Sequence, residues 1–381
     1  MKNTLDSVKK TSTKPQMFDP GRDASRDASR DVSRDAIMPA TTETTSINSR
    51  DTMPKVSELT RRHVPTPMAK QPFQWQFLLP QYWGIWLALA LFMPLIYLPL
   101  RWQFKIGKYL GLAIFKLVKR RRNDTLTNFR LIYPEKSEEE RFEMSKMVFI
   151  NAGVGLFESL CAWYRPDVFT RQVTVSGLQH VSEAQRQGKA VLLLGAHYTM
   201  LDLGGRLTSM FLPVDVVYRP QNNPLMEWFI FNSRTHVYQD QIDHDDMRKL
   251  AKNIKDGHII WYSPDQDFGL KQGVMAPFFG VSAATLTAQR RLAKLGDKKN
   301  PPVLIMFHSY RETPVDMPKG RHPHYHLSFS PVIDNYPSTD EVADATRVNR
   351  LLENYLRIDP TQYMWFHRRF KTQPDGTKYY Q

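Results

Sequence analysis

Short apolar runs that alternate with helical segments constrain the fold of this 381-residue chain more than any other feature. The runs have the length of buried strands and are rich in Val, Ile and Leu: Val191–Leu194, Val214–Tyr218, His258–Ser263 and Val303–Phe307. The segments around them are typical of helices: Leu201–Phe211, Pro224–Thr235, Asp245–Asp256 and Ala283–Leu295. Strands that alternate with helices usually build a parallel sheet. The pattern therefore predicts an α/β fold with a largely parallel central sheet flanked by helices.

Two Ser-x-x-Glu boxes predict where further helices begin. In such a box the Ser side chain accepts a hydrogen bond from the third helical N–H, and the Glu side chain reaches back to the Ser N–H. Ser137–Glu140 opens a helix that runs towards Trp163, and Ser338–Glu341 opens a helix to Ile358. Tyr325–Ser330 is a candidate late strand.

The first predicted strand leads into a candidate catalytic pair. Gly195 lets the backbone turn after the strand, and His197 and Asp202 follow. Ligands in open α/β sheets bind beyond the carboxyl ends of strands, so His197 lies where chemistry is expected. Five residues of regular helix advance by about 500°, so the two side chains meet only if a turn separates them. Asp202 would then fix the imidazole tautomer and leave the other nitrogen as a base. The alternative is a structural His beside a helix-capping Asp.

Two later loops carry further candidate residues. Arg219 follows the second predicted strand in a Pro-containing loop, where its guanidinium suits a phosphate or carboxylate, unless it is simply a surface Arg. Asp265 and Asp267 follow the third strand in a tight loop. Paired acids of this kind hold a divalent metal or, more often, cap backbone N–H groups in the turn, and we favour the second interpretation.

The remaining metal-like or nucleophile-like residues predict neither a metal nor a cofactor. His322, His324 and His326 alternate like zinc ligands, but Pro323 and the polar residues nearby favour an exposed loop. Cys161, the single cysteine, lies in an apolar context typical of a core residue. The sequence has no Gly-x-Ser-x-Gly motif and no phosphate-binding Gly loop. These features favour direct attack by a substrate hydroxyl, with His197 as the base, over a covalent intermediate.

The amino-terminal third divides by composition into a tail and a membrane-associated segment. Residues 1–70 are polar and contain an Arg-Asp-Ala-Ser repeat, which predicts a disordered low-complexity tail without a signal peptide. Tyr82–Leu100 is almost wholly apolar and long enough for one membrane-spanning helix. Pro94 and Pro99 leave a re-entrant or interfacial segment as the alternative.

Charge indicates on which side of the membrane the bulk of the protein lies. Arg101–Lys119 mixes apolar and basic residues in the manner of an interfacial helix, and Arg120–Arg122 follows it. Basic residues are denser after the apolar stretch than before it, so the positive-inside rule places the carboxyl-terminal bulk in the cytoplasm. The net charge of +14 suits anionic partners. We therefore expect segment 71–122 to be membrane-spanning and interfacial, and 123–381 to be the α/β domain.

These pieces resemble one family over about residues 75–375: the late acyltransferases of bacterial lipid A biosynthesis. The resemblance rests on an ordered set of blocks, which are Arg120-Arg121-Arg122 with Asn128 and Tyr133-Pro134-Glu135, Gly155-Leu156-Phe157-Glu158, Gly195-Ala196-His197 with Asp202, Tyr218-Arg219-Pro220 with Asn223-Pro224, Pro264-Asp265-Gln266-Asp267, and Gln362-Tyr363-Met364-Trp365 with His367-Arg368-Arg369. Glycerol-phosphate acyltransferases share the His-x-x-x-x-Asp motif but carry a Phe-Pro-Glu-Gly-Thr-Arg block, where this chain has Ser-Pro-Asp-Gln-Asp.

The resemblance implies a glycerolipid-acyltransferase-like fold and transfer of a fatty acyl chain, lauroyl-like, from acyl-carrier protein to a hydroxyacyl chain of the Kdo-lipid A precursor. His197 and Asp202 match the family's HxxxxD/E dyad, Arg219 and Asp265 match positions treated as functional, and Glu158 is a weaker candidate for substrate binding. The implied setting is the bacterial inner membrane, with a single-pass anchor, a cytoplasmic catalytic domain, and no cofactor or nucleic acid.

Two alternatives stay open at this point. One is a second-step (myristoyl) or dual acyltransferase of the same pathway. The other is a membrane-tethered protein that binds anionic lipid without chemistry, which explains the charge and the apolar stretch but not the His-Asp pair at a strand end. A nucleic-acid partner rests on charge alone, because the basic residues lie beside the apolar stretch rather than in a recognition motif.

Overall fold

The computed structural model describes residues 45–46, 68–169, 172–296, 300–318 and 320–380. These described residues belong to one compact unit. The predicted tail 1–70, including its repeat, lies almost entirely outside the described residues.

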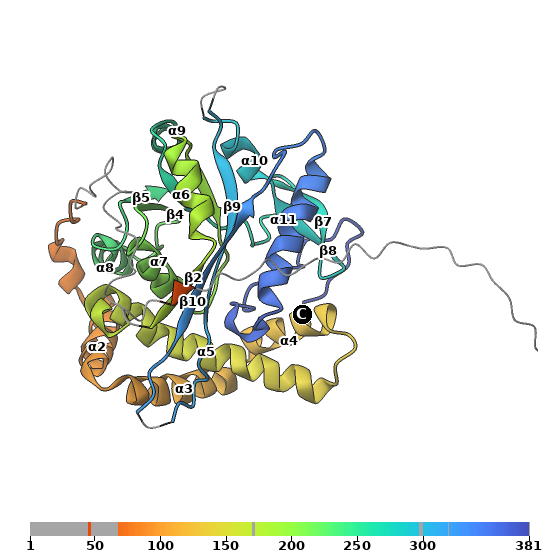
Figure 1. Ribbon diagram of the computed structural model, residues 1–381. Coiled ribbons are helices and arrows are strands. Elements are labelled where there is room, and N and C mark those ends of the chain that lie inside the picture. The colour runs from red at the N-terminus through yellow and green to blue at the C-terminus, as the bar shows by residue number, and fades with distance from the viewer. Residues whose placement is uncertain (1–44, 47–67, 170–171, 297–299, 319, 381) are drawn as a thin grey trace, which may run out of the picture. The chain divides into compact units, whose positions relative to one another are not determined.

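A mixed, mostly parallel sheet forms the centre of this unit (Figure 1). Its strand order is β1-β2-β10-β9-β3-β6-β4-β5. The pairs from β9 through β3, β6 and β4 to β5 are all parallel, β2 pairs parallel with β10, and β10 is antiparallel to β9. The strand bounds are Thr45–Ser46 for β1, Val173–Ser176 for β2, Val191–Leu194 for β3, Val214–Tyr218 for β4, Asp240–Asp243 for β5, Ile259–Tyr262 for β6, Val303–Arg311 for β9 and Tyr325–Val332 for β10.

Helices cover both faces of the sheet, which is why its central strand is apolar throughout. The four residues of β3 are fully buried. Leu192 and Leu194 belong to one core cluster, and Val191 and Leu193 belong to the other. The first cluster takes side chains from α9 (Met247–Lys255), α10 (Ala288–Leu292) and α11 (Glu341–Leu356), and the second from α5 (Glu138–Tyr164), α6 (Leu178–Arg186) and α7 (Leu201–Ser209). The predicted α/β class, with a mostly parallel sheet flanked by helices, is confirmed.

The predicted helix start at Ser137 is confirmed in detail. Ser137 Oγ accepts from the N–H of Glu140 at 3.1 Å, and Glu140 Oε2 accepts from the N–H of Ser137 at 2.8 Å. The resulting helix, α5, is 27 residues long and reaches Tyr164. At the other predicted start the cap is Asp340, whose carboxylate accepts from two N–H groups of α11.

One predicted helix is partly wrong. Within Ala283–Leu295 the structure has strand β8, Val281–Leu286, followed by the short helix α10. β8 pairs antiparallel with β7, Gly273–Phe278, to form a separate two-stranded sheet. The turn between them needs Gly280, whose φ is +78°. Small residues such as Ala283 fit a helix as well as a strand, so only the pairing with β7 decides the conformation.

The apolar stretch before the sheet is not one continuous helix. It contains α2, Trp83–Phe92, a 3₁₀ turn at Pro94–Tyr97, and α3, Leu100–Leu117. Proline lacks an N–H and disfavours helical geometry in the residue before it, so Pro94 and Pro99 interrupt the segment. α3 runs alongside α5 (Figure 1). The two backbones approach closely, because a Cβ on Gly153 would lie 2.2 Å from the carbonyl oxygen of Gly107.

Among the described residues, the helix long and apolar enough to cross a membrane is α5, and 67% of its most apolar window is buried inside the protein. A buried core helix meets the same criterion of length and composition. The predicted membrane-spanning helix over Tyr82–Leu100 stays a prediction.

Candidate functional site

The loop after β3 is held by a carboxyl-terminal segment of the chain. The N–H of Thr199 donates to the carbonyl of Gln362 at 2.8 Å, and the N–H of Met364 donates to the carbonyl of His197 at 2.9 Å. Helix α5 also crosses closely, since a Cβ on Gly155 would lie 2.0 Å from the Thr199 carbonyl oxygen. His197 therefore lies on a loop whose backbone is fixed from two sides, as a catalytic side chain requires.

Asp265 is the acid that contacts His197. Its Oδ1 accepts from Nδ1 of His197 at 2.8 Å, and its Oδ2 accepts from the backbone N–H of His197 at 2.9 Å. The hydroxyl of Tyr363 also donates to Oδ2, at 2.8 Å. The Asp265 side chain is fully buried, whereas 26% of the His197 side chain is exposed. Because Nδ1 donates its proton to Asp265, the neutral imidazole has its lone pair on Nε2.

Burial and charge set the protonation behaviour of this pair. Burial disfavours the imidazolium, but attraction to the Asp265 carboxylate and the hydrogen bond to it are together stronger, so the pKa of His197 lies above its ordinary value of 6.5. Burial works against ionisation of Asp265, yet His197 and the hydrogen bonds hold the pKa of this carboxyl well below its usual range. Asp265 therefore stays ionised and orients a basic imidazole.

The expected hydrogen bond between His197 and Asp202 is not the one the structure contains. Oδ1 of Asp202 instead accepts from Nε of Arg234 at 2.8 Å, and both side chains are largely buried, at 13% and 14% exposed. Arg234 is the last residue of α8, Pro224–Arg234. Asp202 is close to His197 in sequence, but the Nδ1 atom of His197 is hydrogen-bonded to Asp265, which lies on the loop after the neighbouring strand β6. Arg234 could not be found from the sequence, because it lies among ordinary helix residues and no local motif marks it.

A second imidazole and an amide complete the surroundings of His197. Nε2 of Gln266 lies 3.1 Å from Nε2 of His197 and 3.0 Å from Nε2 of His367, and the two rings meet edge to face at 5.4 Å between centroids. Burial is the main reason why the pKa of His367 falls to about 4. Asn128 fixes this segment by donating to the carbonyls of Trp365 at 2.9 Å and of His367 at 2.8 Å. Both Gln266 and His367 belong to motif blocks of the sequence, but no pattern in the sequence assigns either of them a role beside His197.

The other two candidate residues form no hydrogen bond or ion pair with His197, and their environments differ. Arg219 is exposed on the loop after β4, and it forms no hydrogen bond or ion pair with any residue the structure describes. Glu158 is fully buried in α5, where it accepts from Nη1 of Arg311 at 2.7 Å and from the hydroxyl of Tyr325 at 2.8 Å. Glu158 thus ties α5 to β9 and β10, and the substrate-binding roles of both residues stay predictions.

The acidic and histidine motifs form internal contacts. Asp267 caps the tail by accepting from the N–H and the hydroxyl of Thr372, each at 2.8 Å. His326 contacts the hydroxyls of Thr174 and Ser176, and His324 pairs with Glu312. Within the described ranges, the one group with metal-ligand spacing is Asp243, His244 and Asp245 at the end of β5, which is largely exposed.

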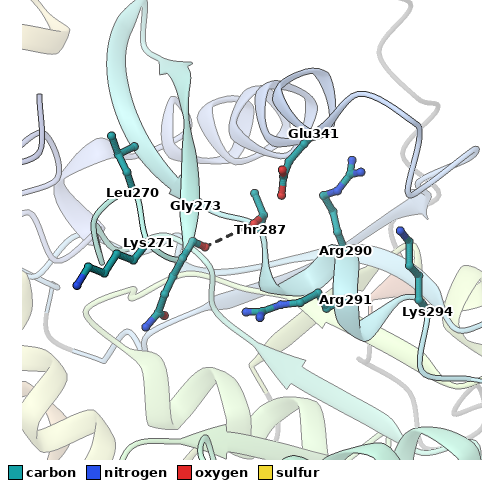
Figure 2. A pocket seen from close by; sticks show the side chains of 9 residues that line it. Leu270, Lys271, Gly273, Thr287, Arg290, Arg291, Lys294 and Glu341 are labelled. Carbon is teal, nitrogen blue, oxygen red and sulfur yellow. Dashed lines mark hydrogen bonds between the residues drawn. The ribbon is translucent and has the colours of Figure 1, made fainter. Parts of the chain in front are cut away.

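A basic pocket of about 460 Å³ opens between α10, the start of β7 and the start of α11 (Figure 2). Arg290 and Arg291 project from α10, Lys294 follows it, and Lys271 lines the pocket from the loop before β7, with its side chain directed away from the other three (Figure 2). Arg290 is engaged with Asp344 and with the carbonyls of Ser338 and Asp340. Lys271, Arg291 and Lys294 are exposed and pair with no carboxylate among the described residues.

Comparison with known proteins identifies the family. Residues 70–372 match the family described as bacterial lipid A biosynthesis acyltransferase. The chain is 34% identical to the lipid A biosynthesis lauroyltransferase of Escherichia coli K12 over 306 residues, which are 80% of this chain and 96% of the relative. It is 33% identical to the palmitoleoyltransferase of the same strain over the same shares, and 25% identical to the myristoyltransferase over 80% and 92%. The chain therefore belongs to the bacterial lipid A biosynthesis acyltransferase family.

Proposed function

We propose that the protein moves a fatty acyl chain, lauroyl-like, from acyl-carrier protein to a hydroxyacyl chain of the Kdo-lipid A precursor. The observation that carries the proposal is the hydrogen bond from His197 Nδ1 to Asp265, which leaves the Nε2 lone pair as a base beyond the carboxyl end of β3. The family supplies the lipid A pathway and the acyl transfer.

The proposed chemistry follows from the weakness of an alcohol as a nucleophile near neutral pH. Nε2 of His197 takes the proton of the acceptor hydroxyl as its oxygen attacks the thioester carbonyl carbon. The carbon–sulfur bond then breaks, and the imidazolium returns the proton to the departing thiolate. Asp265 stays ionised and stabilises the imidazolium. Asp202 does not contact the imidazole in this scheme. Its role is to position the guanidinium of Arg234 at the end of α8 through their ion pair.

The reaction is tested with purified protein in detergent, lauroyl-acyl-carrier protein and Kdo-lipid A precursor. The proposal predicts that the mass of the lipid rises by one acyl increment and that free acyl-carrier protein thiol appears in equal amount. Lipid binding without a mass change would support the non-catalytic alternative instead. Donors with lauroyl, palmitoleoyl and myristoyl chains in parallel decide chain length, and acceptors with and without an earlier secondary chain separate first-step, second-step and dual activity.

The donor proposal is supported by the charge of the basic pocket. Lys271, Arg291 and Lys294 offer exposed positive charge without a carboxylate partner in the described chain, which suits a donor protein with an acidic docking surface. Exposed charges act mainly on encounter and weaken with salt. The double change Arg291→Glu and Lys294→Glu is expected to raise the KM for the donor about five- to tenfold at low salt with kcat nearly constant. The double change Arg248→Glu and Lys255→Glu on α9 is the matched control, because both residues are exposed and the change in net charge is the same. An unchanged KM in the pocket variant would exclude this surface as the docking site.

The proposed location is the bacterial inner membrane, with the α/β part in the cytoplasm. Large apolar side chains are exposed along the segment before α4 (Lys119–Ile132), among them Trp75, Trp83, Leu87, Leu91, Tyr97 and Leu117. Such a surface is stable against lipid rather than water, whether the segment spans the bilayer or lies in its interface. Leu87→Glu with Leu91→Glu should lower co-sedimentation with vesicles containing anionic lipid. Unchanged sedimentation would remove this segment as the anchor.

A further inference from the structure

The side-chain amide of Gln266 lies between two imidazole nitrogens. Its Nε2 is 3.1 Å from Nε2 of His197 and 3.0 Å from Nε2 of His367. An amide nitrogen has two hydrogens and no free lone pair, so both contacts require imidazole nitrogens that accept. His197 meets this requirement because its proton is on Nδ1, donated to Asp265. The burial that keeps the pKa of His367 low leaves that ring neutral as well.

This arrangement blocks the atom that the proposed reaction uses. The lone pair on Nε2 of His197 is the one that would take the acceptor proton, and in this structure the Gln266 N–H occupies it. A substrate hydroxyl must approach the same nitrogen at hydrogen-bond distance. The amide and the hydroxyl therefore compete for one position.

We infer that Gln266 is a positioning residue that covers the basic nitrogen of His197 until the acceptor hydroxyl displaces it, while His367 retains the amide. The inference rests on the proposed function, in which His197 is the base. His367 can retain the amide because its own backbone is held in place: the side-chain amide of Asn128 donates to the carbonyl oxygen of His367 at 2.8 Å. When the hydroxyl arrives, the amide loses one hydrogen bond and keeps the other, so it stays beside the site and returns after product leaves.

The same contact biases the imidazole towards its neutral form. A donor N–H directed at Nε2 is compatible with the lone pair but opposes an N–H at that atom, so Gln266 disfavours the imidazolium. The other charged or titratable groups facing the ring are Asp265, which favours the imidazolium, and His367, with Arg121 acting on His367. Ser263 Oγ, 3.3 Å from Nδ1, is neutral. Gln266 therefore lowers the pKa of His197, whereas Asp265 raises it.

Gln266→Glu tests the inference through the sign of its effect. A carboxylate in place of the amide attracts the imidazolium, so the acid limb of the kcat/KM profile should move to higher pH by at least about one unit. Gln266→Met removes the donor without adding charge and should shift the limb in the same direction by less. Gln221→Glu is the matched control, because this exposed residue adds the same charge without facing the ring, and its profile should coincide with that of the wild type.

A second readout separates this inference from the proposed function. ¹⁵N-histidine NMR of the full-length protein in detergent follows the ionisation of His197 without turnover. The inference predicts a protonated Nδ1 in the wild type and a higher His197 pKa in Gln266→Glu and in Gln266→Met. An unchanged pKa in both variants would overturn it, even if acyl transfer is observed. If the pKa rises while the His197→Ala variant still acylates, the contact stands and the base assignment fails.

Discussion

Replacing Asp265 with asparagine tests which acid orients the candidate base. Three donors converge on the two carboxylate oxygens: Nδ1 and the backbone N–H of His197, and the hydroxyl of Tyr363, at 2.8–2.9 Å. An asparagine offers one oxygen acceptor and one NH₂ group in almost the same shape. At least one buried donor then faces another donor, and the negative charge that stabilises the imidazolium is lost.

The magnitude follows from these two losses. An unsatisfied buried donor costs about 1–3 kcal/mol, so the free energy of unfolding should fall by that amount. Turnover should fall by about 10²–10⁴-fold, the range expected when a positioned base loses its correct tautomer or charge. The pKa of His197 should fall as well, because the attraction to Asp265 is what raises it.

The assay is acyl transfer by purified Asp265→Asn, with a urea unfolding curve on the same preparation. Asp267→Asn is the matched control: it lies on the same loop and is buried, but its carboxylate caps Thr372 rather than His197. The control should lose stability and keep kcat within about tenfold. Full activity in Asp265→Asn, together with complete loss in Asp202→Asn, would refute the assignment and restore Asp202 as the orienting acid.

Four further predictions concern the ion pairs of His197, Asp202 and Glu158. Because the base must be neutral and the pKa of His197 is raised, kcat/KM should increase with pH through an apparent pKa above about 6.5, and a pH-independent profile between 5 and 8 would contradict this. The free energy of unfolding should change with pH in the opposite direction. The His197–Asp265 ion pair contributes its full stabilisation below about pH 6.5, and this contribution is lost as the pH rises through the raised pKa of His197 in the folded protein. Asp202→Asn leaves Arg234 with an amide partner and should reduce turnover less than His197→Ala, which comparison of single-turnover rates checks. Glu158→Ala strands the buried Arg311 and should destabilise the protein by about 3–5 kcal/mol in urea unfolding, whereas a change under about 1 kcal/mol would show that this ion pair does not hold α5 to the sheet.

The central part of the fold could be predicted because its signals are local. β3 is an unbroken apolar run, and α5 begins at a capping box that four consecutive residues define. β8 could not be predicted in this way, since Ala283 and its neighbours suit either a helix or a strand until β7 pairs with them. Pro94 and Pro99 indicate an interruption of the apolar stretch, and the structure has a 3₁₀ turn between α2 and α3 at this point.

The position of His197 at the candidate site could be predicted from the sequence, whereas the residues that contact its imidazole could not. His197 was found because it follows a strand end, which is a sequence property. Nearness in sequence predicts Asp202 as its partner. In the structure β6 lies next to β3 in the sheet, and the loop after β6 brings Asp265 to the imidazole. Gln266 and His367 meet from segments 101 residues apart, and no pattern in the sequence pairs them.

The rate of acyl transfer by His197→Ala tests the central claim most directly. Purified wild type and variant are compared in single turnover with saturating acyl-carrier-protein donor and lipid A precursor, and product is read by lipid mass. The account predicts a rate at least about 10²-fold lower in the variant, with precursor binding close to that of the wild type. The unfolding midpoint should fall, because Asp265 loses its imidazole partner, but the variant should stay folded under the assay conditions. A variant that binds the precursor, stays folded and acylates it at nearly the wild-type rate would contradict the claim that this imidazole is the base.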